Sequence, residues 1–120
     1  MTADQYNPIV QNNLTATITN GTTQSNAVNL SGCSLCGIFI PATFDGTTLT
    51  VQVAPTLNGT YINAQAASSA SAVYTIAAAA NQYVPIENLA IVAGWQFIKF
   101  TAGTTQTTTD TVLTLAVRPV

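Results

Sequence analysis

The chain has 120 residues, of which 48% are hydrophobic and only 5% are charged. This length suits a single domain that buries its own hydrophobic core without metal or disulfide support. With two basic residues and a formal net charge of -2, the surface cannot neutralise a run of phosphates, so we expect neither nucleic acid nor an anionic membrane as a partner.

Residues 1 to 13 are polar and contain Pro8, so we expect an N-terminal arm that reaches a neighbouring subunit, with Tyr6 as a possible contact. The arm lacks the basic segment followed by an apolar segment that marks a secretory signal peptide, which predicts synthesis in the cytoplasm. No apolar stretch approaches the roughly 20 residues that span a bilayer.

Alternation of apolar and polar residues with a period of two begins at residue 14 and indicates half-buried strands. After the first strand, Asn20-Gly21 suits the positive φ angles of a tight hairpin turn. A second short strand is expected around Val28. Residues 35 to 40, LCGIFI, are apolar without alternation, which predicts a central strand buried on both faces. Leu14, Ala16 and Ile18 mark the expected first strand.

The second half of the chain continues the alternation of predicted strands and turns. Asn58-Gly59 predicts a turn, residues 65 to 72 an exposed loop, and residues 77 to 80 a strand end rather than a helical turn. Pro85 restricts its short strand to an edge of a sheet or reduces it to extended coil. Residues 95 to 100 form an aromatic-rich strand, and a Thr-rich loop, residues 104 to 109, precedes the last one. The clearest alternation lies at Leu49, Val51 and Val53 and at Leu113, Leu115 and Val117.

These elements amount to about eight or nine short strands, which predicts an all-β fold: a two-sheet antiparallel sandwich of jelly-roll or Greek-key type. No linker or change of composition divides the chain after the arm. We therefore expect residues 14 to 120 to form one β-sandwich domain.

Cys33 and Cys36 have the C-x-x-C spacing that serves zinc binding or thiol–disulfide exchange in other proteins. A structural zinc ion needs about four ligands, and the chain has no His and no second cysteine pair. We expect two structural thiols and neither a metal nor a cofactor. A local disulfide and a metal ion shared between subunits are the alternatives.

Four carboxylates and no His leave little material for acid–base catalysis, so we expect no enzymatic activity. Asp45 and Asp110 lie in turn-like surroundings, where an Asp side chain most often bonds the nearby backbone. Trp95 beside Phe97 is typical of a core residue, although an exposed Trp could stack on a sugar.

Lys99 interrupts an apolar strand, where its stem can pack while its amine reaches solvent or forms an ion pair with another subunit. Arg118 is a second possible intersubunit contact. Charged side chains normally keep free sheet edges apart, and this chain has few of them. We therefore expect other protein chains to cover much of its surface.

Five stretches carry a resemblance: SNAVNLSG (25 to 32), GIFIPATF (37 to 44), LTVQV (49 to 53), GWQFIKFTAGT (94 to 104) and LTLAVRPV (113 to 120). In this order they resemble a family of small virion-associated proteins encoded beside capsid genes in tailed bacteriophages. The resemblance implies a β-sandwich that decorates or cements the head, commonly as a homotrimer that bridges subunits of the major capsid protein. It also implies location in the virion and provides no catalytic residues. The chain departs from this family at residues 54 to 80, where relatives often carry charged residues and this chain is almost wholly Ala, Ser, Thr and Asn.

An alternative function is a receptor- or glycan-binding module of a head or tail fibre. Aromatic side chains at loop tips could stack on sugar rings, as in many binding sites. The candidate residues are Tyr6, Tyr61, Tyr74 and Tyr83.

Overall fold

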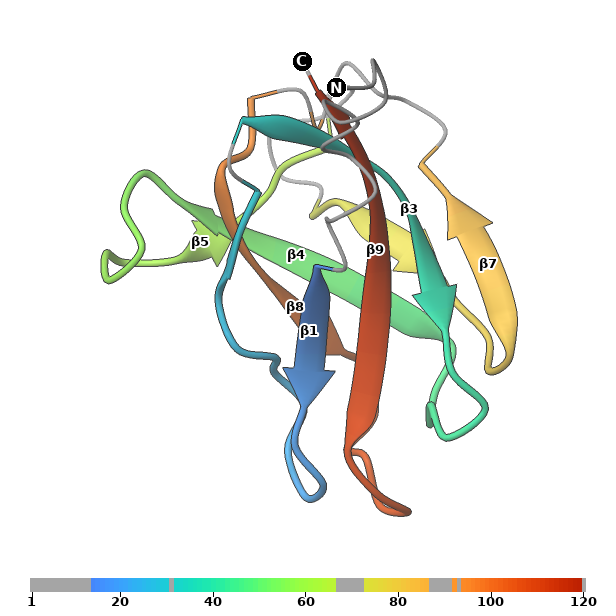
Figure 1. The fold of residues 1–120 in the computed structure, drawn as a ribbon. Coiled ribbons are helices and arrows are strands. Elements are labelled where there is room, and N and C mark those ends of the chain that lie inside the picture. Colours follow the sequence, from blue (N-terminus) through green and yellow to red (C-terminus); the bar gives the residue numbers. More distant parts are fainter. Residues whose placement is uncertain (1–13, 31, 67–72, 87–91, 93, 120) are drawn as a thin grey trace, which may run out of the picture.

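The computed structural model describes residues 14 to 30, 32 to 66, 73 to 86, 92 and 94 to 119. This part of the chain contains nine β-strands, all paired antiparallel, in two sheets that face each other (Figure 1). The predicted all-β, two-sheet sandwich is confirmed. The predicted N-terminal arm, residues 1 to 13, and most of the predicted exposed loop at residues 65 to 72 lie outside the described residues.

Each sheet combines strands that lie far apart in the sequence. Sheet A has the order β1 (Thr15–Ile18), β9 (Thr111–Pro119), β3 (Cys33–Ile40), β7 (Gln82–Pro85). Sheet B has the order β2 (Val28–Asn29), β8 (Phe97–Ala102), β4 (Thr48–Ala54), with β5 (Ile62–Asn63) and β6 (Thr75–Ala77) both paired with β4.

The chain crosses repeatedly from one sheet to the other. The strands β1, β3, β7 and β9 belong to sheet A, and the strands between them in sequence belong to sheet B. Among the described strands, β4 and β5 are the one pair of consecutive strands that bond to each other. This is the strand order of a jelly roll, one of the two arrangements that the alternation predicts.

Alternation along the strands produces the core between the sheets. On β9, Leu113, Leu115 and Val117 are buried and face inward, whereas Val112 and Arg118 are exposed. Full burial of a Leu or Val side chain stabilises the fold by about 1.5–3 kcal/mol. From sheet B the fully buried side chains are Leu49, Val51, Ile98 and Phe100. The predicted inward rows of β4 and β9 are thus confirmed, with Val53 only partly buried.

The strand at residues 35 to 40 differs from its prediction. β3 does lie in the interior of sheet A, between β9 and β7, but Phe39 is 53% exposed. The register with β9 shifts between Leu35 and Gly37, so Cys36 occupies a bulge. Burial on both faces was the wrong interpretation, because no described strand covers the outer face of sheet A.

The predicted turn at Asn20-Gly21 is confirmed, but its type and the extent of the pairing beside it differ from the prediction. Thr22 N donates a hydrogen bond to Thr19 O at 2.9 Å, and Gly21 has a φ of 89°, whereas Asn20 does not have positive φ. These features fit a type II turn, which needs positive φ only at its second central residue. One antiparallel bridge, between Ile18 and Ser25, joins the two sides of the turn. The pairing does not extend into a full hairpin, because the chain leaves sheet A here and continues into β2 of sheet B.

Gln106, in the β8–β9 loop, bonds to the β3–β4 loop through its side chain and to the β1–β2 loop through its backbone. Its side chain is completely buried. The Nε2 amide donates to the backbone oxygens of Asp45 (2.8 Å) and Thr104 (3.0 Å), while Oε1 accepts from Asp45 N (2.9 Å) and the Thr111 hydroxyl (2.8 Å). All four hydrogen-bonding positions of the amide are therefore occupied.

Candidate functional site

The outer face of sheet A is the candidate contact surface. Strand register places one outward row of each strand on this face, because directly paired residues point to the same side of a sheet. We call it the aromatic face. Its residues are Thr15, Thr17, Ser34, Gly37, Phe39, Tyr83, Pro85, Val112, Thr114, Ala116 and Arg118.

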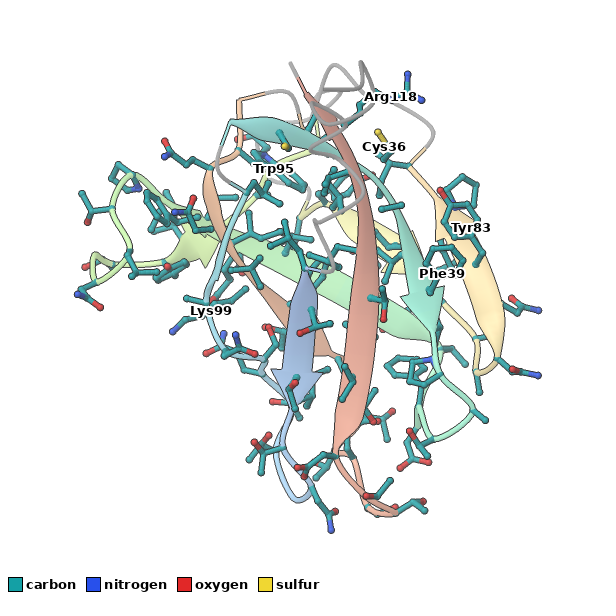
Figure 2. The ribbon with its side chains drawn as sticks, viewed as in Figure 1. Cys36, Phe39, Tyr83, Trp95, Lys99 and Arg118 are labelled. Atoms are coloured by element: carbon teal, nitrogen blue, oxygen red, sulfur yellow. The ribbon has the colours of Figure 1, made fainter. Side chains whose placement is uncertain are left out.

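An aromatic pair forms the most exposed apolar part of this face. Phe39 on β3 and Tyr83 on β7 are direct register partners, with ring centroids 4.7 Å apart and ring planes inclined by 50°. Phe39 is 53% exposed, Tyr83 is 46% exposed, and Val112 on β9 is 42% exposed. Figure 2 shows the two rings side by side on the outside of the sheet. Exposed apolar side chains grouped in this way are typical of protein interaction sites.

Gly37 determines how Tyr83 lies. A Cβ atom at position 37 would collide with the hydroxyl and ring atoms of Tyr83, so the ring occupies the space that a larger residue would fill. Gly37 is itself buried. The ring therefore lies across the sheet, a position that presents its exposed surface outward.

The aromatic face has one charged residue, Arg118, near one end of β9 (Figure 2). Asp45 and Asp110 lie in loops instead, as the sequence predicts, and both accept backbone hydrogen bonds. Asp45 Oδ2 accepts from Thr107 N at 2.9 Å, and Asp110 Oδ1 accepts from Asn20 N at 2.8 Å. Their partners come from distant parts of the sequence rather than from adjacent residues.

The outer face of sheet B is polar and hydrogen bonded. Gln24 Nε2 donates to Gln52 Oε1 at 2.7 Å, and Gln52 Nε2 donates to Asn63 Oδ1 at 3.3 Å. The Lys99 ammonium lies 4.5 Å from the centroid of the Tyr61 ring, a cation–π contact. Much of this face is therefore occupied by contacts within the chain.

The candidate intersubunit residues do not come together in one site. Lys99 lies on sheet B and Arg118 on sheet A, well separated in Figure 2, and Tyr6 lies outside the described residues. Lys99 contacts the aromatic ring of its own chain, which neither sequence interpretation included. An intersubunit role for these three residues stays a prediction.

Cys33 and Cys36 are both half-buried thiols at the start of β3. The Cys36 sulfur is positioned to donate a weak hydrogen bond to Ser34 O at 3.5 Å. Within the described residues, no three His, Cys, Asp or Glu side chains are grouped closely enough to hold a metal ion.

The tyrosines proposed for glycan binding lie in separate surroundings. Tyr61 contacts Lys99, Tyr83 pairs with Phe39, and Tyr74 makes an edge-on contact with Trp95, with ring centroids 5.6 Å apart. Trp95 and Tyr74 are partly buried and pack against the core, so the core interpretation of Trp95 is confirmed.

Sequence reasoning missed the Phe39–Tyr83 pair. Phe39 was hidden in an apolar run, and Tyr83 was considered only for sugar binding. The proline after Val84 was the one available signal, because Pro85 predicts an edge strand, whose neighbouring side chains are less covered.

No helix in the described part of the chain is both long enough and apolar enough to cross a membrane. The chain matches no protein-family model, no curated protein and no solved structure.

Proposed function

We propose that this protein is a structural component of a bacteriophage virion, a decoration or cement protein that bridges subunits of the major capsid protein. The observation that carries the proposal is the aromatic face, which combines exposed Phe39, Tyr83 and Val112 with a single charged side chain. The choice of the capsid as partner rests on the sequence resemblance to virion-associated proteins of tailed phages.

The physical mechanism is the burial of surface at the assembled shell. Covering an apolar face removes it from water, and each square ångström of apolar surface contributes about 25 cal/mol before the costs of association. A stable interface buries about 1,200–2,000 Å² in total, so the aromatic face forms its centre and polar residues form its rim. A ligand that binds only the assembled shell stabilises it by mass action.

Self-association is the second part of the proposal. A homotrimer, with Arg118, Lys99 and the arm residue Tyr6 at or near the contacts, would place several aromatic faces against adjacent capsid subunits. Several weak contacts made at once raise the apparent affinity far above that of one contact. Native mass spectrometry of the purified protein measures this directly, and a monomer at all accessible concentrations would remove the trimer from the proposal.

The test compares binding to, and heat survival of, phage heads depleted of this protein. Phe39→Glu places a carboxylate at the centre of the aromatic face, where desolvation makes it costly to bury. Thr75→Glu is the control, because Thr75 is exposed on β6 of the opposite sheet. We expect wild type and Thr75→Glu to bind and protect heads, and Phe39→Glu to lose both properties.

Equal heat survival of decorated and depleted heads would count against a cement role. Equal binding of Phe39→Glu and Thr75→Glu to the depleted heads would instead exclude the aromatic face as the contact. Specific binding of a glycan that is lost on Tyr83→Ala would favour the receptor-binding alternative.

A further inference from the structure

Two Asn-Gly dipeptides lie in loops that differ in their hydrogen bonds to the rest of the fold. Asn20-Gly21 follows β1, and Asn58-Gly59 lies between β4 and β5. Asparagine before glycine is chemically labile, because the glycine amide nitrogen approaches the preceding side chain without hindrance from a Cβ atom. The fold decides which of the two sites can react.

We propose that Asn58 is a site of spontaneous deamidation and that the fold protects Asn20. In the first step the backbone nitrogen of Gly59 attacks Cγ of Asn58, and the side-chain amide leaves as ammonia after a proton moves to it. The product is a five-membered succinimide ring. Water then opens the ring at either carbonyl, producing aspartate or isoaspartate, with no oxidant, metal or cofactor needed.

The loop around Asn58 permits this attack. Residues 55 to 58 are exposed. The Gly59 amide makes one local hydrogen bond, to Thr56 O at 3.2 Å. Tyr61 Oη donates to Leu57 O at 2.7 Å, a bond that holds the peptide before Asn58 and not the Asn58–Gly59 peptide. Opening one exposed turn is enough to release the attacking nitrogen.

The loop around Asn20 opposes the same attack. Gly21 N donates to the backbone oxygen of Gln106 at 2.7 Å, and Asn20 N donates to Asp110 Oδ1 at 2.8 Å. Gln106 N in turn donates to Thr22 O at 3.1 Å, so the strand-like pairing continues past the turn. Both peptides that flank Asn20 are held by residues from a distant loop. Because these bonds must open before attack, we expect Asn20 to react about tenfold more slowly than Asn58, or slower still.

The reaction changes the surface in one place. The new carboxylate takes the formal net charge from -2 to -3, since -2 and one further negative charge make -3. It appears beside Leu57, which is 46% exposed. Deamidated and unmodified molecules therefore differ by one negative charge in the β4–β5 loop, away from the aromatic face on sheet A.

The experiment incubates purified full-length protein in mildly alkaline buffer and follows both sites by peptide mapping with mass spectrometry. We expect conversion at Asn58 at least about tenfold faster than at Asn20. The same chain in concentrated denaturant is the matched control, because the two dipeptides should then react at similar rates. Asn58→Ser should abolish the fast phase, and Asp110→Ala should accelerate Asn20 alone.

Three results would overturn the inference. These are equal rates in the folded protein, a faster reaction at Asn20, or an Asn58 that stays intact in the folded protein while it converts in denaturant. None of these results depends on whether the protein binds capsids. The deamidation proposal and the proposed function are therefore tested independently.

Discussion

Replacing Gln106 by leucine tests whether one buried amide holds the β3–β4 loop to the β8–β9 loop. Leucine keeps the apolar bulk but removes all four hydrogen bonds to Asp45, Thr104 and Thr111. Each bond contributes about 0.5–1.5 kcal/mol net to the free energy of unfolding, so the four bonds together contribute at most about 6 kcal/mol. Water can reach the half-buried Asp45 backbone and the exposed Thr104, but not the fully buried Thr111. We therefore expect a loss of about 3 kcal/mol in the free energy of unfolding.

Urea denaturation followed by the fluorescence of Trp95 measures this loss, and thermal unfolding should show a Tm lower by about 12 °C for a domain of this size. Gln24→Leu is the matched control, because Gln24 is exposed and its substitution should cost less than about 0.5 kcal/mol. A loss below about 1 kcal/mol for Gln106→Leu would refute the reasoning, because it would mean that water replaces the whole network.

Three further substitutions test the packing of the sandwich. Gly37→Ala should cost about 1–3 kcal/mol in urea denaturation, because its methyl group displaces the Tyr83 ring, and the loss should shrink in a Tyr83→Ala background. Ser25→Ala should cost about 1–3 kcal/mol, because Phe100 N loses the Ser25 hydroxyl that accepts its hydrogen bond at 2.9 Å; a Ser25→Thr protein as unstable as Ser25→Ala would contradict this. Phe100→Ala should cost about 3–5 kcal/mol, measured as a lower Tm, since Phe100 is fully buried between the sheets; a cost under about 1 kcal/mol would contradict that placement.

The sequence predicts the sandwich well where burial is one-sided. On β4 and β9 an apolar residue at every second position indicates the inward row, because successive side chains of a strand point to opposite faces. The same logic fails on β3. An apolar run there looks like burial on both faces, but Phe39 faces outward, and no local signal says what covers a sheet.

The Gln106 network could not be predicted from the sequence. The residue lies in a Thr-rich segment that reads as an ordinary exposed loop, and its partner Asp45 is 61 positions away. The Phe39–Tyr83 pair could not be predicted for the same reason, since the two rings meet only when β3 and β7 pair in one register. Local patterns report which face a residue takes, whereas contacts between distant loops and strands depend on the connectivity of the whole fold.

The position of β9 has a consequence for how the protein is made. This strand lies between β1 and β3, yet it is the last of the nine to leave the ribosome. Until residues 111 to 119 emerge, β1 has no neighbour in sheet A and β3 can pair only with β7. The nascent chain must therefore keep its apolar segments soluble throughout synthesis and then complete sheet A in one late, long-range step.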